Sequence, residues 1–137
     1  MASRKHRHSL SGGLVRTFKK FVETVRTKGV NEVHLQTEID LTHNEYNNFQ
    51  KLRYFGLVYY ADKENRKSGK WIVTKLGGMF IRREIAIVDW VMTEDNHIVE
   101  KSVSKRFIDE HFGGAYDIDY WQREFGFTSS TQQGKLL

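Results

Sequence analysis

The chain of 137 residues contains no cysteine, no proline and no long run of apolar residues. The absence of cysteine excludes disulfides, thiolate metal ligands and a cysteine nucleophile. The apolar runs span only a few residues, whereas a membrane-spanning helix needs about 20. The N-terminal segment also lacks the unbroken apolar stretch of a secretory signal. We therefore expect a soluble, cytoplasmic protein with no membrane partner.

Sequence motifs of enzymes and metal sites are missing as well. There is no P-loop, dinucleotide-binding fingerprint or nucleophile elbow. The six histidines lack the grouped spacing of zinc ligands, so we expect no metal and no cofactor. Asp117 and Asp119, near Glu110 and His111, have the chemistry of a cation site or an acid–base pair, but helix capping and surface charge explain them more simply. We do not expect an enzyme.

The charge is divided unevenly along a chain whose apolar content, 39 %, is sufficient for a hydrophobic core. Residues 1–30 carry eight Lys or Arg against one Glu, and residues 61–85 carry seven against three acidic residues. Residues 31–60 and 86–137 are acidic, with net charges of −2 and −4. This division indicates a surface for polyanions on the N-terminal part and a different role for the C-terminal part. Ordinary surface charge remains the alternative interpretation.

Apolar periodicity predicts two helices in the first half of the chain. A helix over residues 12–28 is expected between a Ser11 cap and a Gly29 stop. Residues 33–35 favour a short strand, and residues 37–41 a brief helix. The capping box Thr42–Glu45 then opens a helix over residues 43–54, which Gly56 ends. Its inward stripe is expected to be Tyr46, Phe49 and Leu52.

Two hairpins and further short helices are predicted after this point. Residues 57–61 and 70–74 alternate as antiparallel strands joined by a basic loop, and residues 85–92 and 97–103 form a second pair. A helix capped by Thr74 is expected to run to about Arg83, where Gly77-Gly78 implies close approach of another backbone segment. Short helices are predicted over residues 104–111, before Gly113, and over residues 117–125.

Residues 41–76 resemble the winged helix-turn-helix family. The matching features are Leu52, three residues and then Gly56-Leu57-Val58, followed by Trp71-Ile72-Val73-Thr74 before a Lys-Leu-Gly helix start. The resemblance implies an α+β fold, with a three-helix core and a β-hairpin wing, over residues 10–85. We expect residues 1–9 to be a flexible basic arm, residues 86–127 an acidic, aromatic-rich α/β extension, and residues 128–137 a flexible tail.

The resemblance also implies nucleic-acid binding, with duplex DNA as the first choice and RNA as another. Helix 43–54 would enter the major groove, and asparagine is suited to adenine there. The wing, the arm and the first helix would contact phosphates. The candidate nucleic-acid-binding residues are His43, Asn44, Asn47, Asn48, Lys51, Tyr54, Lys63, Arg66, Lys67, Lys70, Arg4, Lys5, Arg7, Arg16, Lys19 and Lys20. A simply solvated helix face is the alternative for the asparagines.

Two functional hypotheses follow. The first is a small winged-helix DNA-binding protein, a bacterial or phage transcriptional regulator or replication accessory, that acts by occupancy. The second is a protein-binding module, such as a phage-encoded inhibitor that docks on a host nucleoprotein like a CRISPR effector and contacts RNA. The eight large aromatic residues between Trp90 and Phe127 would serve a homodimer or another protein partner.

Overall fold

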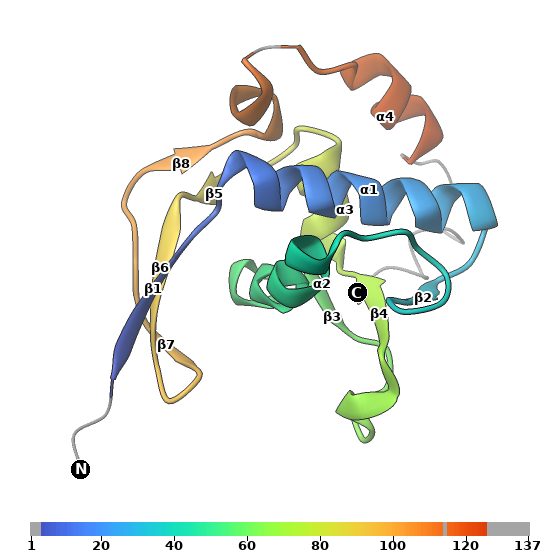
Figure 1. The fold of residues 1–137 in the computed structure, drawn as a ribbon. Helices are drawn as coiled ribbons and strands as arrows, with labels where there is room; N and C mark the ends of the chain where they lie inside the picture. Colours follow the sequence, from blue (N-terminus) through green and yellow to red (C-terminus); the bar gives the residue numbers. More distant parts are fainter. Residues whose placement is uncertain (1–3, 114, 126–137) are drawn as a thin grey trace.

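The longest helix, α1 (Gly12–Lys28), spans the molecule and the other elements pack around it (Figure 1). The computed structural model describes residues 4–113 and 115–125, which form four α-helices, three 3₁₀ helices and three small antiparallel sheets. The expected α+β class is confirmed. In chain order the elements are β1 (Lys5–Ser9), α1, β2 (Glu32–His34), α2 (His43–Phe49), η1 (Gln50–Phe55), β3 (Val58–Tyr60), η2 (Arg66–Ser68), β4 (Lys70–Val73), α3 (Lys75–Ile81), β5 (Ile87–Val88), β6 (Trp90–Glu94), β7 (His97–Lys101), β8 (Lys105–Arg106), η3 (Ile108–Phe112) and α4 (Ile118–Glu124).

The predicted boundaries of α1 are confirmed. The Ser11 hydroxyl accepts a hydrogen bond from the Leu14 N–H at 3.2 Å, and Gly29 ends the helix with a left-handed φ of 64°. Glycine takes this conformation without the steric cost that a Cβ atom brings. The stripe at helical spacing, which includes Phe18 and Phe21, is fully buried.

The next helix begins as predicted but changes its geometry halfway. The Thr42 hydroxyl accepts from the Glu45 N–H, and the Glu45 carboxylate accepts from the Thr42 N–H at 2.8 Å, so the capping box is confirmed. The α-helix ends at Phe49 and continues as the 3₁₀ helix η1 to Gly56. The inward assignment of Tyr46 is wrong, because its side chain is exposed and its hydroxyl accepts a hydrogen bond from the Gln36 amide at 3.1 Å.

The predicted helix over residues 37–41 is absent, and turns take its place. The Glu38 carboxylate accepts from the His34 N–H at 2.9 Å, and the Gln36 N–H donates to the His34 ring at 3.2 Å. Such bonds between side chains and nearby backbone compete with helical hydrogen bonding. Ile39 and Leu41 nevertheless pack against the core, as their apolar character predicts.

Strands β2, β4 and β3 form one antiparallel sheet in that order. The predicted pairing of the two strands after Gly56 is confirmed by the register Val58 opposite Val73. Thr74 then caps α3 by accepting from the Gly77 N–H at 2.9 Å. Helix α3 stops at Ile81, earlier than the expected Arg83, because Arg83 has a left-handed φ of 61°.

The N-terminal segment differs most from its prediction. Residues 1–9 were expected to be a flexible arm, but Lys5–Ser9 pair with β6 along their whole length, in a sheet of order β1-β6-β7. The backbone hydrogen bonds of this pairing fix the segment without needing apolar side chains. The buried Leu10 anchors its end and donates its N–H to the Asp89 carbonyl at 2.8 Å.

The second hairpin is confirmed over a shorter span than predicted. Strands β6 and β7 turn at Asp95 and Asn96, which both have positive φ, as two-residue hairpin loops require. Residues 87–88 pair with β8 instead of extending the hairpin. Residues 105–106 are therefore a strand, and the helix predicted over 104–111 shrinks to η3.

The C-terminal part packs onto the same core as the rest. Ile108, Trp121 and Phe125 belong to one buried cluster with residues of α1 and α2. The predicted helix over residues 117–125 is confirmed by α4, whose Asp117 carboxylate caps the Tyr120 N–H at 3.0 Å. The tail predicted over residues 128–137 lies outside the described residues. Among the described helices, none has both the length and the apolar character needed to cross a membrane.

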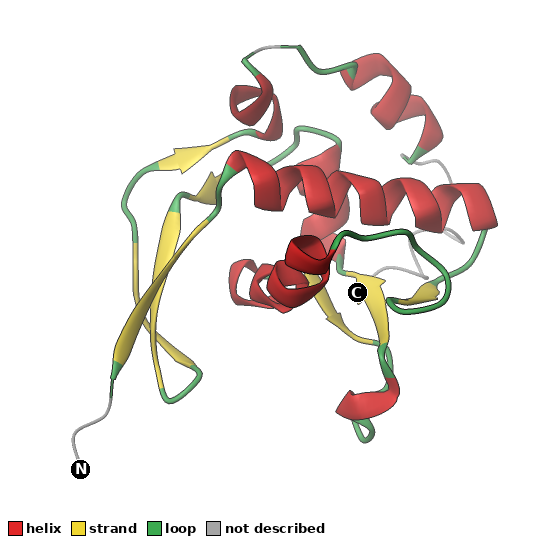
Figure 2. Ribbon diagram, in the orientation of Figure 1, coloured by secondary structure: helices red, strands yellow, loops and turns green. Residues whose placement is uncertain are grey.

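Figure 2 shows the strands of the β1–β6–β7 and β2–β4–β3 sheets apart from the C-terminal helix α4. The β1–β6–β7 sheet and the β3–β4 hairpin project to the same side of α1, whereas η3 and α4 lie on its opposite side. Helix α2 lies between the two projections. This arrangement places an amide-rich helix between two strand pairs.

Candidate nucleic-acid interface

The solvent-facing side of α2 carries the polar residues that the sequence singled out. His43, Asn44 and Asn47 are exposed, whereas Asn48 and Lys51 are partly buried. The Asn47 amide is hydrogen bonded to the His43 ring at 3.0 Å, and the Asn48 amide donates to the Asn44 carbonyl at 2.9 Å. These bonds run along the helix surface, so a ligand that accepts from either amide must replace them.

A hollow of about 370 Å³ lies at one side of this face. Asn44, Asn48 and Lys51 line it together with Ser9 at the end of β1 and Ser11 at the start of α1. The structure thus brings three of the predicted α2–η1 residues to one recess beside the first turn of α1.

Tyr54 is held by contacts with the β1–β6–β7 sheet. Its ring stacks on His8, with centroids 4.9 Å apart, and its hydroxyl donates to the Asn96 side chain at 3.3 Å. It was predicted as an outward residue, and it instead joins η1 to the neighbouring sheet. Through these two contacts, the sheet is held beside the helix at strand β1 and at the turn between β6 and β7.

Strand alternation sends the basic residues of β1 to the face away from α2. Arg7 is opposite Met92, and its guanidinium lies over the Trp90 ring at 4.2 Å. Lys5 shares this face by alternation, while Arg4 precedes the strand and is exposed. Lys5 and Arg7, two of the three predicted arm cations, therefore point away from the helix.

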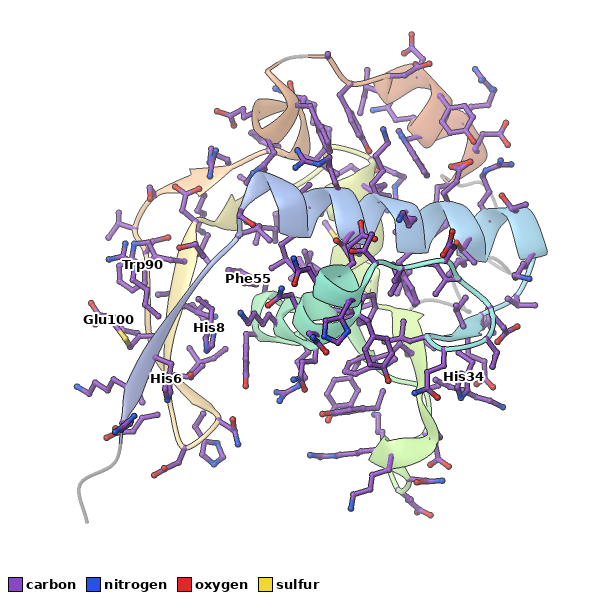
Figure 3. The ribbon with its side chains drawn as sticks, in the orientation of Figure 1. His6, His8, His34, Phe55, Trp90 and Glu100 are labelled. Atoms are coloured by element: carbon purple, nitrogen blue, oxygen red, sulfur yellow. The ribbon has the colours of Figure 1, made fainter. Side chains whose placement is uncertain are left out.

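His6 and His8 occupy the face of β1 that is turned toward α2 (Figure 3). The His8 ring forms a hydrogen bond with the Thr93 hydroxyl at 3.0 Å. Burial, followed by the positive charges of Lys51, His6 and Arg53, lowers the pKa of His8 below 6.5. Sequence reasoning left these histidines out of the site, although their H-x-H spacing is the signal of one strand face.

The loop of residues 62–69, here called the basic loop, forms the tip of the second projection. Lys63, Arg66 and Lys67 are all exposed on it, as predicted, and the Arg66 guanidinium lies over the Tyr60 ring at 5.3 Å. The Asp62 carboxylate shapes the loop by accepting from two backbone N–H groups. Lys70 follows the loop and contacts Glu32 at 3.6 Å.

The predicted cations of α1 differ in their availability. Arg16 is exposed. Lys20 donates to the Glu45 carboxylate at 2.8 Å and to the Asp40 carbonyl, and this hydrogen bond lowers the pKa of Glu45. Lys19 lies over the Phe112 ring at 5.2 Å, so the C-terminal part covers its side of the helix.

Arg53 was not among the predicted site residues, yet it is central to this region. Its guanidinium lies 4.4 Å from the Tyr54 ring centroid and 5.9 Å from that of Tyr60. Its Nε is buried and has no hydrogen-bond partner among the described residues. Arg53 follows the change from α to 3₁₀ geometry at Gln50, and no residue pattern signals such a change.

The described residues contain no group of three or more His, Asp or Glu side chains arranged to hold a metal ion. Asp117 is engaged in capping α4, and the Glu110 carboxylate accepts from the Phe107 N–H at 2.8 Å. The chain matches no protein-family model, no curated protein and no solved structure. What this surface binds therefore follows only from its own residues and their geometry.

Proposed function

We propose that the protein is a winged-helix DNA-binding protein that acts by occupying duplex DNA, as a transcriptional regulator or replication accessory. The observation that carries the proposal is the exposed, amide-rich face of α2 between two projections, one of which ends in Lys63, Arg66 and Lys67. The strand order β2-β4-β3, with α2 and η1 immediately before β3, supports a winged-helix topology. Helix α2 would enter the major groove, and the basic loop would be the wing.

The chemistry of each part suits a different portion of DNA. Asparagine side chains pair with adenine edges in the major groove, which is about 12 Å wide. The basic loop supplies phosphate contacts, which dominate affinity but carry no sequence information. Lys51 lines the hollow together with Ser9 and Ser11 and is suited to a phosphate or a guanine acceptor.

The β1–β6–β7 sheet, which is the other projection, adds histidines rather than permanent charges. His8 faces α2 from β1, and a nearby phosphate would favour its protonated form. Duplex binding should therefore strengthen as the pH falls toward 6. This contribution replaces the one expected from Lys5 and Arg7.

A second candidate function is docking on another protein, and the edge strand β7 favours it. This strand is exposed along its length, with Ile98 and Val99 at 40 % and 49 % exposure. No strand of residues 4–113 or 115–125 pairs with its outer edge in the β1-β6-β7 sheet, so a partner could add a strand there. A homodimer or an inhibitor of a nucleoprotein would use such an edge.

The test is fluorescence anisotropy with random duplex DNA and structured RNA at about 50 and 200 mM salt. Contacts from Lys51, Lys63, Arg66 and Lys67 predict four phosphate contacts, and hence about a 100-fold loss of duplex affinity over this range. The double variant Arg66→Ala/Lys67→Ala should reduce the salt slope by about two.

The matched control, Lys28→Ala/Arg123→Ala, removes two exposed cations outside the proposed interface and should leave the slope nearly unchanged. No duplex binding at 50 mM salt would refute the proposal. Equal losses in both double variants would show that only net charge matters, and would refute the assigned interface. Tight protein binding that is insensitive to salt would favour the second candidate.

A further inference from the structure

A recess of about 350 Å³ lies between the end of η1 and the strands β5, β7 and β8. Three cations, Arg53, Lys101 and Lys105, line it, and no Asp or Glu among the described residues does. Residues 86–137 as a whole carry nine acidic residues and five basic ones, and two of those five lie here. The local charge is thus opposite to that of the segment that supplies half of the residues lining the recess.

None of these cations is neutralised within the described part of the chain. No carboxylate lies within 4 Å of Arg53, Lys101 or Lys105, although eight such ion pairs form elsewhere in that part. The Arg53 Nε is buried without an acceptor among the described residues, and the hydrogen bond described for this guanidinium is a long one, from Nη2 to the Tyr54 hydroxyl at 3.3 Å. A buried donor without an acceptor is unfavourable, so this guanidinium is suited to an incoming anion.

The remaining wall of the recess is apolar. Phe55, Leu76, Ile98 and residues 85–88 supply it, and Ile98 is 40 % exposed. Gly56 lies in the same wall, where an added Cβ would stand 3.0 Å from a Leu76 methyl group. An apolar wall with a few convergent polar groups, in a volume of about 300–1,000 Å³, is the usual form of a small-molecule site.

We propose that this recess binds a small amphipathic anion, with an apolar or aromatic body against Leu76 and Ile98 and a carboxylate, sulfonate or phosphate on the three cations. The apolar body displaces water from the exposed isoleucine, and the anion pairs with cations that have no carboxylate within 4 Å among the described residues. The site is separate from the exposed face of α2, and its existence does not depend on DNA binding.

The test uses two fluorescent probes with the same ring system. 1-Anilinonaphthalene-8-sulfonate is an amphipathic anion, and N-phenyl-1-naphthylamine is its neutral counterpart. The folded full chain should bind one sulfonate probe with a saturable rise in fluorescence, and the neutral probe about tenfold more weakly or worse. Circular dichroism and a cooperative unfolding transition would verify that the native state is being titrated.

Lys101→Gln/Lys105→Gln should weaken binding of the sulfonate probe about tenfold while leaving the neutral probe unchanged. Both lysines are exposed, so this variant should fold normally. Lys63→Gln/Lys67→Gln removes the same charge from the basic loop and should have no effect. The proposal is overturned if no saturable binding occurs, if the neutral probe binds equally well, or if the two double variants behave alike.

Discussion

Gly77 gives the sharpest prediction about what holds α3 against the β3–β4 hairpin. A Cβ at this position would stand 2.3 Å from the Leu57 carbonyl oxygen and 3.0 Å from a Val73 methyl group. The same oxygen accepts the Thr74 N–H at 3.1 Å, immediately before the helix. A methyl group at residue 77 must therefore move backbone that is already hydrogen bonded, and not merely a flexible side chain.

The expected cost of Gly77→Ala combines three effects. Alanine is better than glycine inside a helix by about 1 kcal/mol. Overpacking costs about 1–3 kcal/mol, and weakening the Thr74–Leu57 hydrogen bond costs about 1 kcal/mol more. The helix gain offsets the hydrogen-bond loss, so the free energy of unfolding should fall by about 1–3 kcal/mol. For a chain of this size that lowers Tm by roughly 3–12 °C.

Urea and thermal unfolding, followed by circular dichroism, measure this effect. Gly13→Ala is the matched control, because its Cβ would meet no atom closer than the Arg16 guanidinium at 3.8 Å. That variant should be as stable as the parent, or up to about 1 kcal/mol more stable. If Gly77→Ala is no less stable than Gly13→Ala, the close approach of α3 to Leu57 is wrong.

The remaining predictions concern a helix cap and two histidines. Thr74→Val should lower the free energy of unfolding by about 1–2 kcal/mol in urea titrations, because the hydroxyl caps the Gly77 N–H; no change would contradict the cap. Burial, and next the Arg106 charge, lowers the pKa of His111, so the unfolded chain binds its proton more readily and Tm should fall as the pH drops below 6.5. The Tm of the His111→Leu variant should fall less between pH 7.5 and 5 than that of the parent, and an identical fall in both proteins would refute this assignment. Duplex affinity in anisotropy titrations should rise from pH 7.5 to 6, and His8→Gln, whose side chain cannot protonate, should lose most of that rise.

Local signals predicted the helix ends well, because each depends on contacts between neighbouring residues. The caps at Ser11, Thr42 and Thr74 and the left-handed stops at Gly29 and Gly56 all occur where the sequence places them. Each uses a side-chain oxygen or a positive φ within about four residues. These caps and stops form regardless of how distant parts of the chain pack.

Elements that depend on distant partners were not predictable in the same way. Strand β1 has no buried side chain, and it pairs with residues more than 80 positions further along the chain. Its polar composition therefore resembles that of an unstructured arm. The shift from α2 to η1 is likewise a consequence of packing, since Gln50 to Phe55 carry ordinary helix-forming residues.

The candidate site was predictable in its chemistry and less so in its geometry. Lys63, Arg66 and Lys67 are exposed as expected, because a turn-rich loop almost always lies on the surface. Lys19 is covered by Phe112 and Tyr116, and Tyr54 by His8. These partners lie more than 40 positions away in the sequence, so no helical pattern reveals the contacts. Alternation along β1 was the one available clue to His6 and His8.

The central claim is that α2 and its two flanking projections form one surface for duplex DNA. The most direct measurement follows the backbone amide chemical shifts of isotope-labelled protein during titration with a duplex. The account predicts saturable changes in α2, the basic loop and β1, and little change along β7 or α4. Changes confined to β7, or no saturable change at low salt, would contradict it.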